Sequence, residues 1–420
     1  MKWIRKSIFI IPIVVVIVAC NVASPISTST ATITPVIPVS SQEANTPTLP
    51  SPTITVMPSA TKNALDLPED CINLKSVDFN PIEFNGLLTL FGTSSNHLFD
   101  PKANQNLDID ESGNQIFYPG LISPNKKYVL VSTHNNGNNI YFDIRTADRI
   151  IRKDIQIPDS WIFGRWLNNE EMAFFSLVPE EYVNIFNPFT GDTKKIRPEL
   201  PNALVMDFSS LFKIIYYYID PTLKRVIYGD QDGKLILWDI EARKEIVSLP
   251  ALVKPNGYLA SPVEVFHPFG WTQDGRKFVT PWPISESNQP LANELYVFDM
   301  SGELKKLTNL NKEYSFAEID IPIWSPDGGR IGFALRIGKT DANPRKPDQW
   351  LAILDTSTLE TKVYCLAIDT SVIWSPDGQR LIINIDGTSR DHESILVDLI
   401  NQTQTVINTN SMYVYDWLSP

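Results

Sequence analysis

The sequence repeats the pentapeptide Trp-Ser-Pro-Asp-Gly at residues 324–328 and 374–378, and a related stretch begins at Trp271. In both copies proline fixes φ early in a tight turn, and aspartate and glycine suit the positions that follow. Short apolar runs flank both copies, as in the two strands of a hairpin. A hairpin that recurs in this way restricts the chain to an all-β repeat architecture.

The position of the repeated tryptophan recurs at intervals of about 43 to 53 residues, close to the length of a four-stranded propeller blade. The seven positions are Ile122, Trp166, Ile219, Trp271, Trp324, Trp374 and Trp417. A second pattern is an apolar run that ends in Asp or Asn before a turn, at Asp143, Asn187, Asp239, Asp299, Asp355 and Asp398. Together the patterns predict units of four short antiparallel strands.

The two ends of the repeat region complement each other. The last unit stops at Pro420, shortly after Trp417, and has only a first strand, whereas residues 87–91 and 97–100 read as later strands of a unit without a first. We therefore predict that residues 412–417 pair beside residues 87–91. This pairing closes a ring of seven four-stranded antiparallel blades and removes the edge that an open array would expose.

At this point a family resemblance is clear. The turn Trp-Ser-Pro-Asp-Gly-x-[Arg/Lys]-aliphatic resembles the repeat of the TolB-type, WD-repeat-like β-propellers, with three clear copies and four degenerate ones. The resemblance covers residues 65–420 and implies a propeller with a solvent channel, most often used as a binding platform. It implies no particular ligand.

We assign the repeat turns a structural role rather than a functional one. Each tryptophan is expected to fill the wedge between neighbouring blades, and each aspartate to cap its turn. The residues concerned are Trp271, Asp274, Gly275, Trp324, Pro326, Asp327, Gly328, Trp374, Pro376, Asp377 and Gly378.

The start of the chain has the three parts of a secretory signal peptide. A cationic start precedes an apolar run over residues 8–18, which is shorter than the ~20 residues of a membrane-spanning helix. Residues 17–20, Ile-Val-Ala-Cys, resemble a bacterial lipobox. This implies a signal peptide over residues 1–19 and fatty acylation, such as palmitate, at Cys20. The interpretation is a lipoprotein on the extracytoplasmic side of a membrane; the alternative is a short uncleaved anchor.

Residues 20–64 predict a disordered tether between the lipidated cysteine and the propeller. The segment consists largely of Ser, Thr, Pro, Ala, Val and Ile, and Glu43 is the one carboxylate before Asn63. Such a composition buries too little apolar surface to fold. The domain organisation is therefore a signal peptide, a tether and a propeller over residues 65–420.

Charge and cysteine content narrow the partners and the compartment. The formal net charge is −12, which argues against nucleic acid as a partner and leaves the lipid anchor as the contact with the membrane. Cys71 and Cys365 remain after Cys20. In an oxidising compartment they form either a disulfide or two free thiols.

Sequence motifs of catalytic sites are missing. The chain has no Gly-x-Ser-x-Gly, no His-Glu-x-x-His and no Cys-x-x-Cys. The histidines, His97, His134, His267 and His392, fall in four predicted blades with no shared spacing. We therefore expect no enzyme activity, no metal and no cofactor.

Deviations from the repeat are the better guide to function. Two insertions between second and third strands, at residues 281–293 and 336–349, are expected on the face opposite the repeat turns. Loops on a rigid scaffold commonly carry specificity. The candidate binding residues are Trp282, Arg336, Lys339, Arg345 and Lys346.

The expected partner of these loops is a protein or peptide of the cell envelope, or a cell-wall glycan. The loops could also be neutral surface excursions. Two other functions stay open: a polysaccharide lyase or hydrolase with its site in the central channel, and a structural component of an envelope assembly.

Overall fold

The computed structural model of the protein describes residues 71–80, 84–91, 96–107, 122–135, 139–158, 161–176, 182–209, 212–215, 217–249, 270–284, 292–313, 317–337, 349–368, 372–386, 392–407, 409 and 412–420. They all belong to the second of two compact units, Ser51–Pro420. The predicted signal peptide, Cys20, the tether and the boundary at residue 65 lie outside the described residues. Within the described part, no helix is long and apolar enough to cross a membrane.

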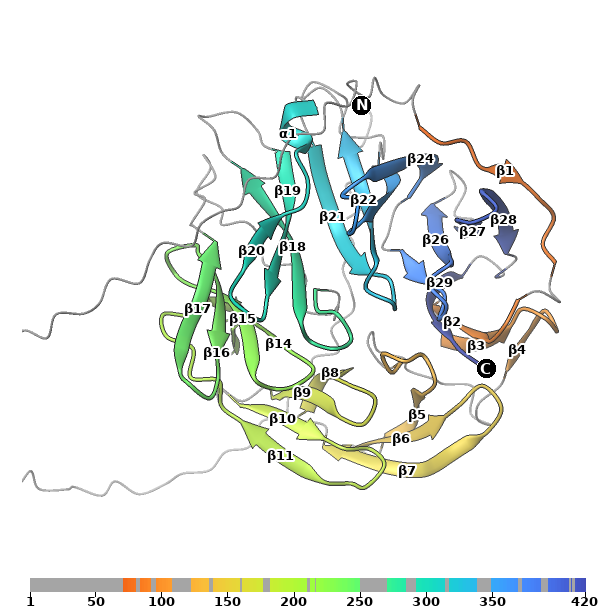
Figure 1. The fold of residues 1–420 in the computed structure, drawn as a ribbon. Helices are drawn as coiled ribbons and strands as arrows, with labels where there is room; N and C mark the ends of the chain where they lie inside the picture. The colour runs from red at the N-terminus through yellow and green to blue at the C-terminus, as the bar shows by residue number, and fades with distance from the viewer. Residues whose placement is uncertain are drawn as a thin grey trace, which may run out of the picture. The chain divides into compact units, whose positions relative to one another are not determined.

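Seven antiparallel sheets, here called blades 1 to 7 in chain order, form a ring (Figure 1). Blade 1 contains β29 (Tyr413–Leu418), β2 (Leu87–Phe91), β3 (Asn96–Asp100) and β4 (Gln105–Leu107). Blade 2 contains β5 (Val129–Asn135), β6 (Asn139–Arg145) and β7 (Ile150–Pro158), with Ile122 bridged to Val129 in place of a first strand. Blade 3 contains β8 (Trp161–Trp166), β9 (Met172–Ser176), β10 (Val183–Phe186) and β11 (Thr193–Ile196).

The remaining blades follow the same order. Blade 4 contains β14 (Tyr217–Ile219), β15 (Arg225–Gly229), β16 (Leu235–Asp239) and β17 (Lys244–Leu249). Blade 5 contains β18 (Lys277–Ile284), β19 (Ala292–Asp299) and β20 (Leu304–Lys306), with Trp271 bridged to Phe278. Blade 6 contains β21 (Ala317–Trp324), β22 (Arg330–Ile337), β23 (Gln349–Asp355) and β24 (Thr361–Ala367). Blade 7 contains β25 (Ile373–Trp374), β26 (Arg380–Asp386), β27 (His392–Asp398) and β28 (Thr403–Ile407).

The predicted closure of the ring is confirmed. Strand β29 pairs antiparallel with β2, with Trp417 opposite Leu88 and Leu418 opposite Leu87. In Figure 1 the blue C-terminal strand accordingly lies beside the orange β2. The seven-bladed, all-β propeller expected from the repeat is therefore the fold of this unit.

Three elements depart from the repeat and were not predicted. A hairpin of β12 (Val205–Ser209) and β13 (Phe212–Ile215) forms a separate two-stranded sheet between blades 3 and 4. A single short helix among the described residues, α1 (Leu310–Glu313), joins blades 5 and 6. Strand β1 (Lys75–Ser76) adds to the outer edge of blade 7.

The repeat turns share one hydrogen-bond pattern. The Ser325 hydroxyl donates to Asp327 Oδ1 (2.5 Å) and accepts from Arg330 N (2.9 Å), and Asp327 Oδ1 also accepts from Gly329 N (3.0 Å). The turn closes with Gly328 at φ 68°, the left-handed region that glycine adopts without a Cβ clash. The same contacts recur at Ser375 and Thr272, and in the degenerate copy at Ser123. The structural role predicted for these turns agrees with this geometry.

The core is divided among the interfaces between neighbouring blades, here called seams. In the described part, seven clusters of buried apolar side chains each draw residues from two adjacent blades. The cluster between blades 4 and 5 combines Leu237 with Phe278, for example, and that between blades 7 and 1 combines Ile382 with Leu88. Each blade therefore contributes to two cores, and blade order is held by packing on both faces.

Indole hydrogen bonds cross three successive seams at equivalent positions. Trp271 Nε1 donates to Tyr218 O (3.1 Å), Trp324 Nε1 to Gly270 O (3.0 Å) and Trp374 Nε1 to Ile323 O (3.1 Å). Each acceptor directly precedes the tryptophan position of the preceding blade. The wedge tryptophans thus supply apolar volume and also satisfy a carbonyl of the neighbouring blade.

Seams without such a donor use other polar contacts. In blade 4 the tryptophan position is Ile219, and Arg165 of blade 3 donates to its carbonyl oxygen (3.2 Å) while lying 6.0 Å from the centre of the Tyr218 ring. Burial lowers the pKa of Arg165 to about 10, so this guanidinium stays protonated at neutral pH. Between blades 1 and 2, Lys126 Nζ pairs with Asp416 Oδ1 (2.6 Å).

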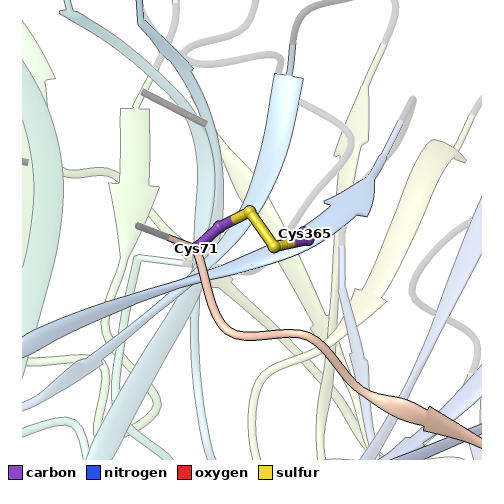
Figure 2. The surroundings of a disulfide bond; sticks show 2 residues. All are labelled: Cys71 and Cys365. Atoms are coloured by element: carbon purple, nitrogen blue, oxygen red, sulfur yellow. A yellow bond between two sulfur atoms is a disulfide. The ribbon is translucent and has the colours of Figure 1, made fainter. Parts of the chain in front are cut away.

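The first described residues run along the outside of the ring as a strap (residues 71–79). Ile72 N donates to Val363 O (2.9 Å) in blade 6, and Lys75 N donates to Gln402 O (3.0 Å) in blade 7. Figure 2 shows the disulfide that joins Cys71 to β24 at Cys365, with a Cα–Cα distance of 5.0 Å. Of the two states left open for these cysteines, the structure has the bonded one.

The indole bonds lead to a test of stability. We expect Trp374→Phe to lower the free energy of unfolding by about 2 kcal/mol, because it removes the hydrogen bond to the Ile323 carbonyl and volume from the seam. The matched control is Trp350→Phe, a half-buried tryptophan of β23, for which we expect less than about 0.5 kcal/mol. Denaturant unfolding measures both; equal costs would show that the cross-seam bond contributes nothing.

The turn aspartates lead to a test of pH dependence. Burial raises the pKa of Asp327, but hydrogen bonds from Ser325 and Gly329 and the charge of Arg330 outweigh it, so the pKa lies below its ordinary value. The pKa values of Asp274 and Asp377 are lowered by the same balance. An aspartate whose pKa is lowered by folding stabilises the fold at pH values above its pKa in the unfolded chain, about 3.9. This contribution is lost as the pH falls through the lower pKa of the folded state.

We therefore expect stability to fall between about pH 5 and pH 3, and less steeply when all three aspartates are replaced by Asn. Some slope should persist, because hydrogen bonds from Ser357 and Thr358 lower the pKa of Asp355 to about 2. Denaturant titrations at a series of pH values check this. An unchanged slope in the triple variant would contradict it.

Candidate functional site

The ring has two chemically different faces. The turn face carries the turns between first and second strands, such as that at Ser325. The loop face carries the connections between second and third strands. The insertion of blade 5 leaves β18 at Ile284 and returns at Ala292, and that of blade 6 leaves β22 at Ile337 and returns at Gln349. Both therefore start from the loop face, as predicted, on blades that share one apolar cluster.

On the turn face, turns of different blades form hydrogen bonds with one another. Asn125 N donates to Asn169 Oδ1 (3.0 Å) and Asn168 Nδ2 donates to Pro221 O (3.2 Å), each across a seam. Gln273 Nε2 of blade 5 also donates to Pro124 O of blade 2 (2.6 Å), although these blades are not neighbours. Turn tips thus meet across the ring, and many of their polar groups have partners within the chain.

Trp282 is not an exposed loop residue, contrary to the prediction. It lies within β18, opposite Glu294, and is 7% exposed in the cluster between blades 4 and 5. The sequence suggested a loop because Pro281 and Pro283 flank it, and proline usually ends a strand. Here β18 stays paired with β19 through both prolines, with Pro281 opposite Leu295 and Pro283 opposite Asn293.

Arg336 was predicted as the first residue of the blade 6 insertion, but it lies within β22, opposite Gln349 of β23, and the insertion begins after Ile337. Its Nη1 contacts Glu318 Oε2 (2.6 Å), and both side chains are 43% exposed. With the Gln349 amide oriented to satisfy both neighbours, Gln349 accepts from Arg336 Nη2 (2.8 Å) and donates to Ile368 O (3.2 Å). The guanidinium therefore links both stems of the insertion. Lys339, Arg345 and Lys346 belong to residues 338–348, outside the described residues.

A buried carboxylate at the root of the blade 5 insertion was missed by the sequence analysis. Glu294 is 0% exposed, and its Oε2 accepts from Thr308 Oγ1 (2.5 Å) and from Leu310 N (2.9 Å). Lys306 Nζ lies 3.3 Å from its other oxygen. Because the carboxylate is enclosed and hydrogen-bonded, it fixes the connection to α1 and is not placed to act on a ligand. One glutamate ahead of an apolar run gives no sequence signal for this role.

The histidines are spread over the ring. His97 lies in β3, His134 in β5 and His392 in β27, whereas His267 is outside the described residues. Among the residues that the structure describes, no group of three His, Cys, Asp or Glu side chains is arranged to hold a metal ion.

Comparison with known proteins gives similarity at the level of structure. No family model and no curated protein matches the sequence. TolB from Acinetobacter baumannii is 14% identical, with a TM-score of 0.38 over 75% of this chain and 77% of that chain. Oligogalacturonate lyase in complex with manganese is 10% identical, with a TM-score of 0.46 over 69% and 75% of the two chains. Oligogalacturonate lyase from Vibrio parahaemolyticus is 11% identical, with a TM-score of 0.46 over 77% and 85%. Similarity at this level transfers no activity to this chain.

Proposed function

We propose that the protein is an exported, lipid-anchored β-propeller that binds a protein or peptide of the cell envelope through its loop face and catalyses no reaction. The observation that carries the proposal is Arg336, a half-exposed cation held by Glu318 and Gln349 at the root of the blade 6 insertion. A side chain held from two sides presents its charge to a partner at low entropic cost.

The charge distribution supports an acidic partner surface. The chain as a whole has a net charge of −12, whereas residues 338–348 carry Lys339, Arg345 and Lys346 against two carboxylates, a net charge of +1, and follow Arg336 in the sequence. A basic loop on an acidic scaffold steers acidic partners to one place and repels them elsewhere. On the turn face, several turn tips bond to one another instead.

The disulfide supports export. Disulfides such as Cys71–Cys365 persist in oxidising compartments and are rare in the cytosol. This agrees with the lipobox-like residues 17–20 and with a tether that places the ring away from a membrane surface.

Partner capture tests the proposal. We expect Ala at Arg336, Lys339, Arg345 and Lys346 to lower crosslinked capture of the partner in cells at least about tenfold, which corresponds to about 1.4 kcal/mol. Trp282 is left unchanged because it is buried. Affinity purification through the propeller after crosslinking, with quantitative mass spectrometry, gives the measurement.

A matched control separates this surface from basic charge in general. Lys153 of β7 and Lys194 and Lys195 of β11 are exposed on outer strands of blades 2 and 3. Their replacement by Ala should leave capture unchanged. Equal losses in both variants, capture of a glycan instead of a protein, or new reducing ends or unsaturated products from acidic oligosaccharides would each contradict the proposal.

Lipid anchoring has its own test. We expect Cys20→Ser to move the protein from the membrane fraction to the soluble fraction and to remove the fatty-acyl mass from the N-terminal peptide, because two or more acyl chains make anchoring stable. Cys71→Ser with Cys365→Ser keeps Cys20 and should stay with the membrane. Membrane association that survives Cys20→Ser would favour the uncleaved anchor.

A further inference from the structure

The strap is fixed to the ring by contacts spaced along its length. Ile72 N donates to Val363 O (2.9 Å) and Ile72 O accepts from Cys365 N (3.0 Å) in blade 6. Lys75 N donates to Gln402 O (3.0 Å) and Val77 N to Gln404 O (3.0 Å) in blade 7. Each backbone hydrogen bond is weak by itself in net terms, because folding exchanges it for bonds to water.

The apolar side chains of the strap touch three successive seams. Cys71 packs against the cluster between blades 5 and 6, and Ile72 and Leu74 against that between blades 6 and 7. Phe79 packs against the cluster between blades 7 and 1. The strap therefore leads from blade 6 to the place where the ring closes.

The far end of the strap meets the closing strand. Phe79 lies 6.2 Å from Phe84, and Phe84 stacks on Trp417 of β29 at 4.4 Å between ring centres. Trp417 Nε1 donates to Asn85 O (2.8 Å). If an applied force detached the strap from the ring, beginning at Cys71, the force would next act on these aromatic contacts. It would then act on the pairing of β29 with β2.

In the chain, the disulfide at Cys71 precedes the contacts of Ile72, Lys75 and Val77. A pull on the chain before Cys71 would otherwise load the bonds of Ile72, Lys75 and Val77 one after another. The bond offers a different route from Cys71 to Cys365, in the middle of β24, which pairs with β23 over several residues. Figure 2 shows this branch point, where the strap and β24 diverge from the two sulfur atoms.

We propose that the Cys71–Cys365 disulfide transfers tension from the tether into blade 6 and so protects the closure of the ring when the protein is pulled from its anchor. This inference rests on the proposed function, because the chain before Cys71 is under tension only if it is anchored. It goes further by assigning the disulfide a mechanical role in addition to its effect on stability.

Single-molecule pulling tests the inference. The full mature chain, with Cys20→Ser, receives one handle at Asn45 in the tether and another at Glu170, an exposed turn residue of blade 3. Both are attached through unnatural amino acids, so no thiol is used. With Cys71→Ser and Cys365→Ser, we expect an early step at low force that lengthens the chain by about 40–50 Å, the extended length of residues 71–84. The disulfide-bonded protein should lack this step.

The controls are a second pulling direction and a second way of removing the disulfide. With handles at Glu170 and Ser301, both exposed in turns of the ring, the first rupture force should be the same with and without the disulfide. If the double variant folds poorly, wild-type protein folded with the bond and then reduced in the chamber replaces it. An unchanged first rupture through the tether, or an equal loss of force in both geometries, would overturn the inference. Partner capture and lipidation are measured separately, so failure of the proposed function is distinguishable from failure of this one.

Discussion

The fold depends on how one blade is held to the next, and the cross-seam indole bond is the interaction that repeats. Backbone ladders run within the blades, whereas each seam is filled by an apolar cluster, and several seams also have a polar contact between the two blades. Trp324 illustrates both parts: its ring is 7% exposed in the seam, and its Nε1 satisfies Gly270 O of blade 5. An indole is large enough to fill a wedge and has one donor to direct. Phenylalanine is smaller and has no donor, so it would fill less of the seam and lose the hydrogen bond that joins the two blades.

The degenerate repeats show which part of this arrangement is required. Blade 4 has Ile219 at the tryptophan position, and Arg165 reaches from the other side of the seam to its carbonyl. Between blades 1 and 2 an ion pair of Lys126 and Asp416 joins the inner ends. The residue type, the donor and the direction of the contact all change, yet each of these seams keeps a polar contact. What persists is the need to satisfy polar groups where two blades converge, because such groups are expensive to bury alone.

The repeat predicted the architecture well, because its signals are local. The turn at residues 324–328 needs only its own side chains and a glycine at positive φ, and the closure followed from a missing strand at each end. The prediction for Trp282 was wrong for the opposite reason. Whether two prolines end a strand depends on tertiary pairing, and β18 stays paired with β19 through Pro281 and Pro283. Glu294 and Arg165 escaped notice because their partners, Leu310 and Ile219, are set by tertiary contacts and by no motif.

The strap adds a second closure to the one made by β29, and the two differ in physical character. The pairing of β29 with β2 is a ladder along a whole strand, whereas the strap makes a few separate contacts over two blades. A disulfide that links residues 294 apart restricts the unfolded chain, by about 6 kcal/mol on a chain-entropy estimate. That gain depends only on the length of the closed loop, and so would be nearly the same for a cysteine several residues further along the strap. Its position at Cys71, ahead of Ile72, Lys75 and Val77, is therefore not explained by stability alone. The position does matter to a chain held from its upstream side, because a bond at Cys71 leaves the contacts of Ile72, Lys75 and Val77 unloaded.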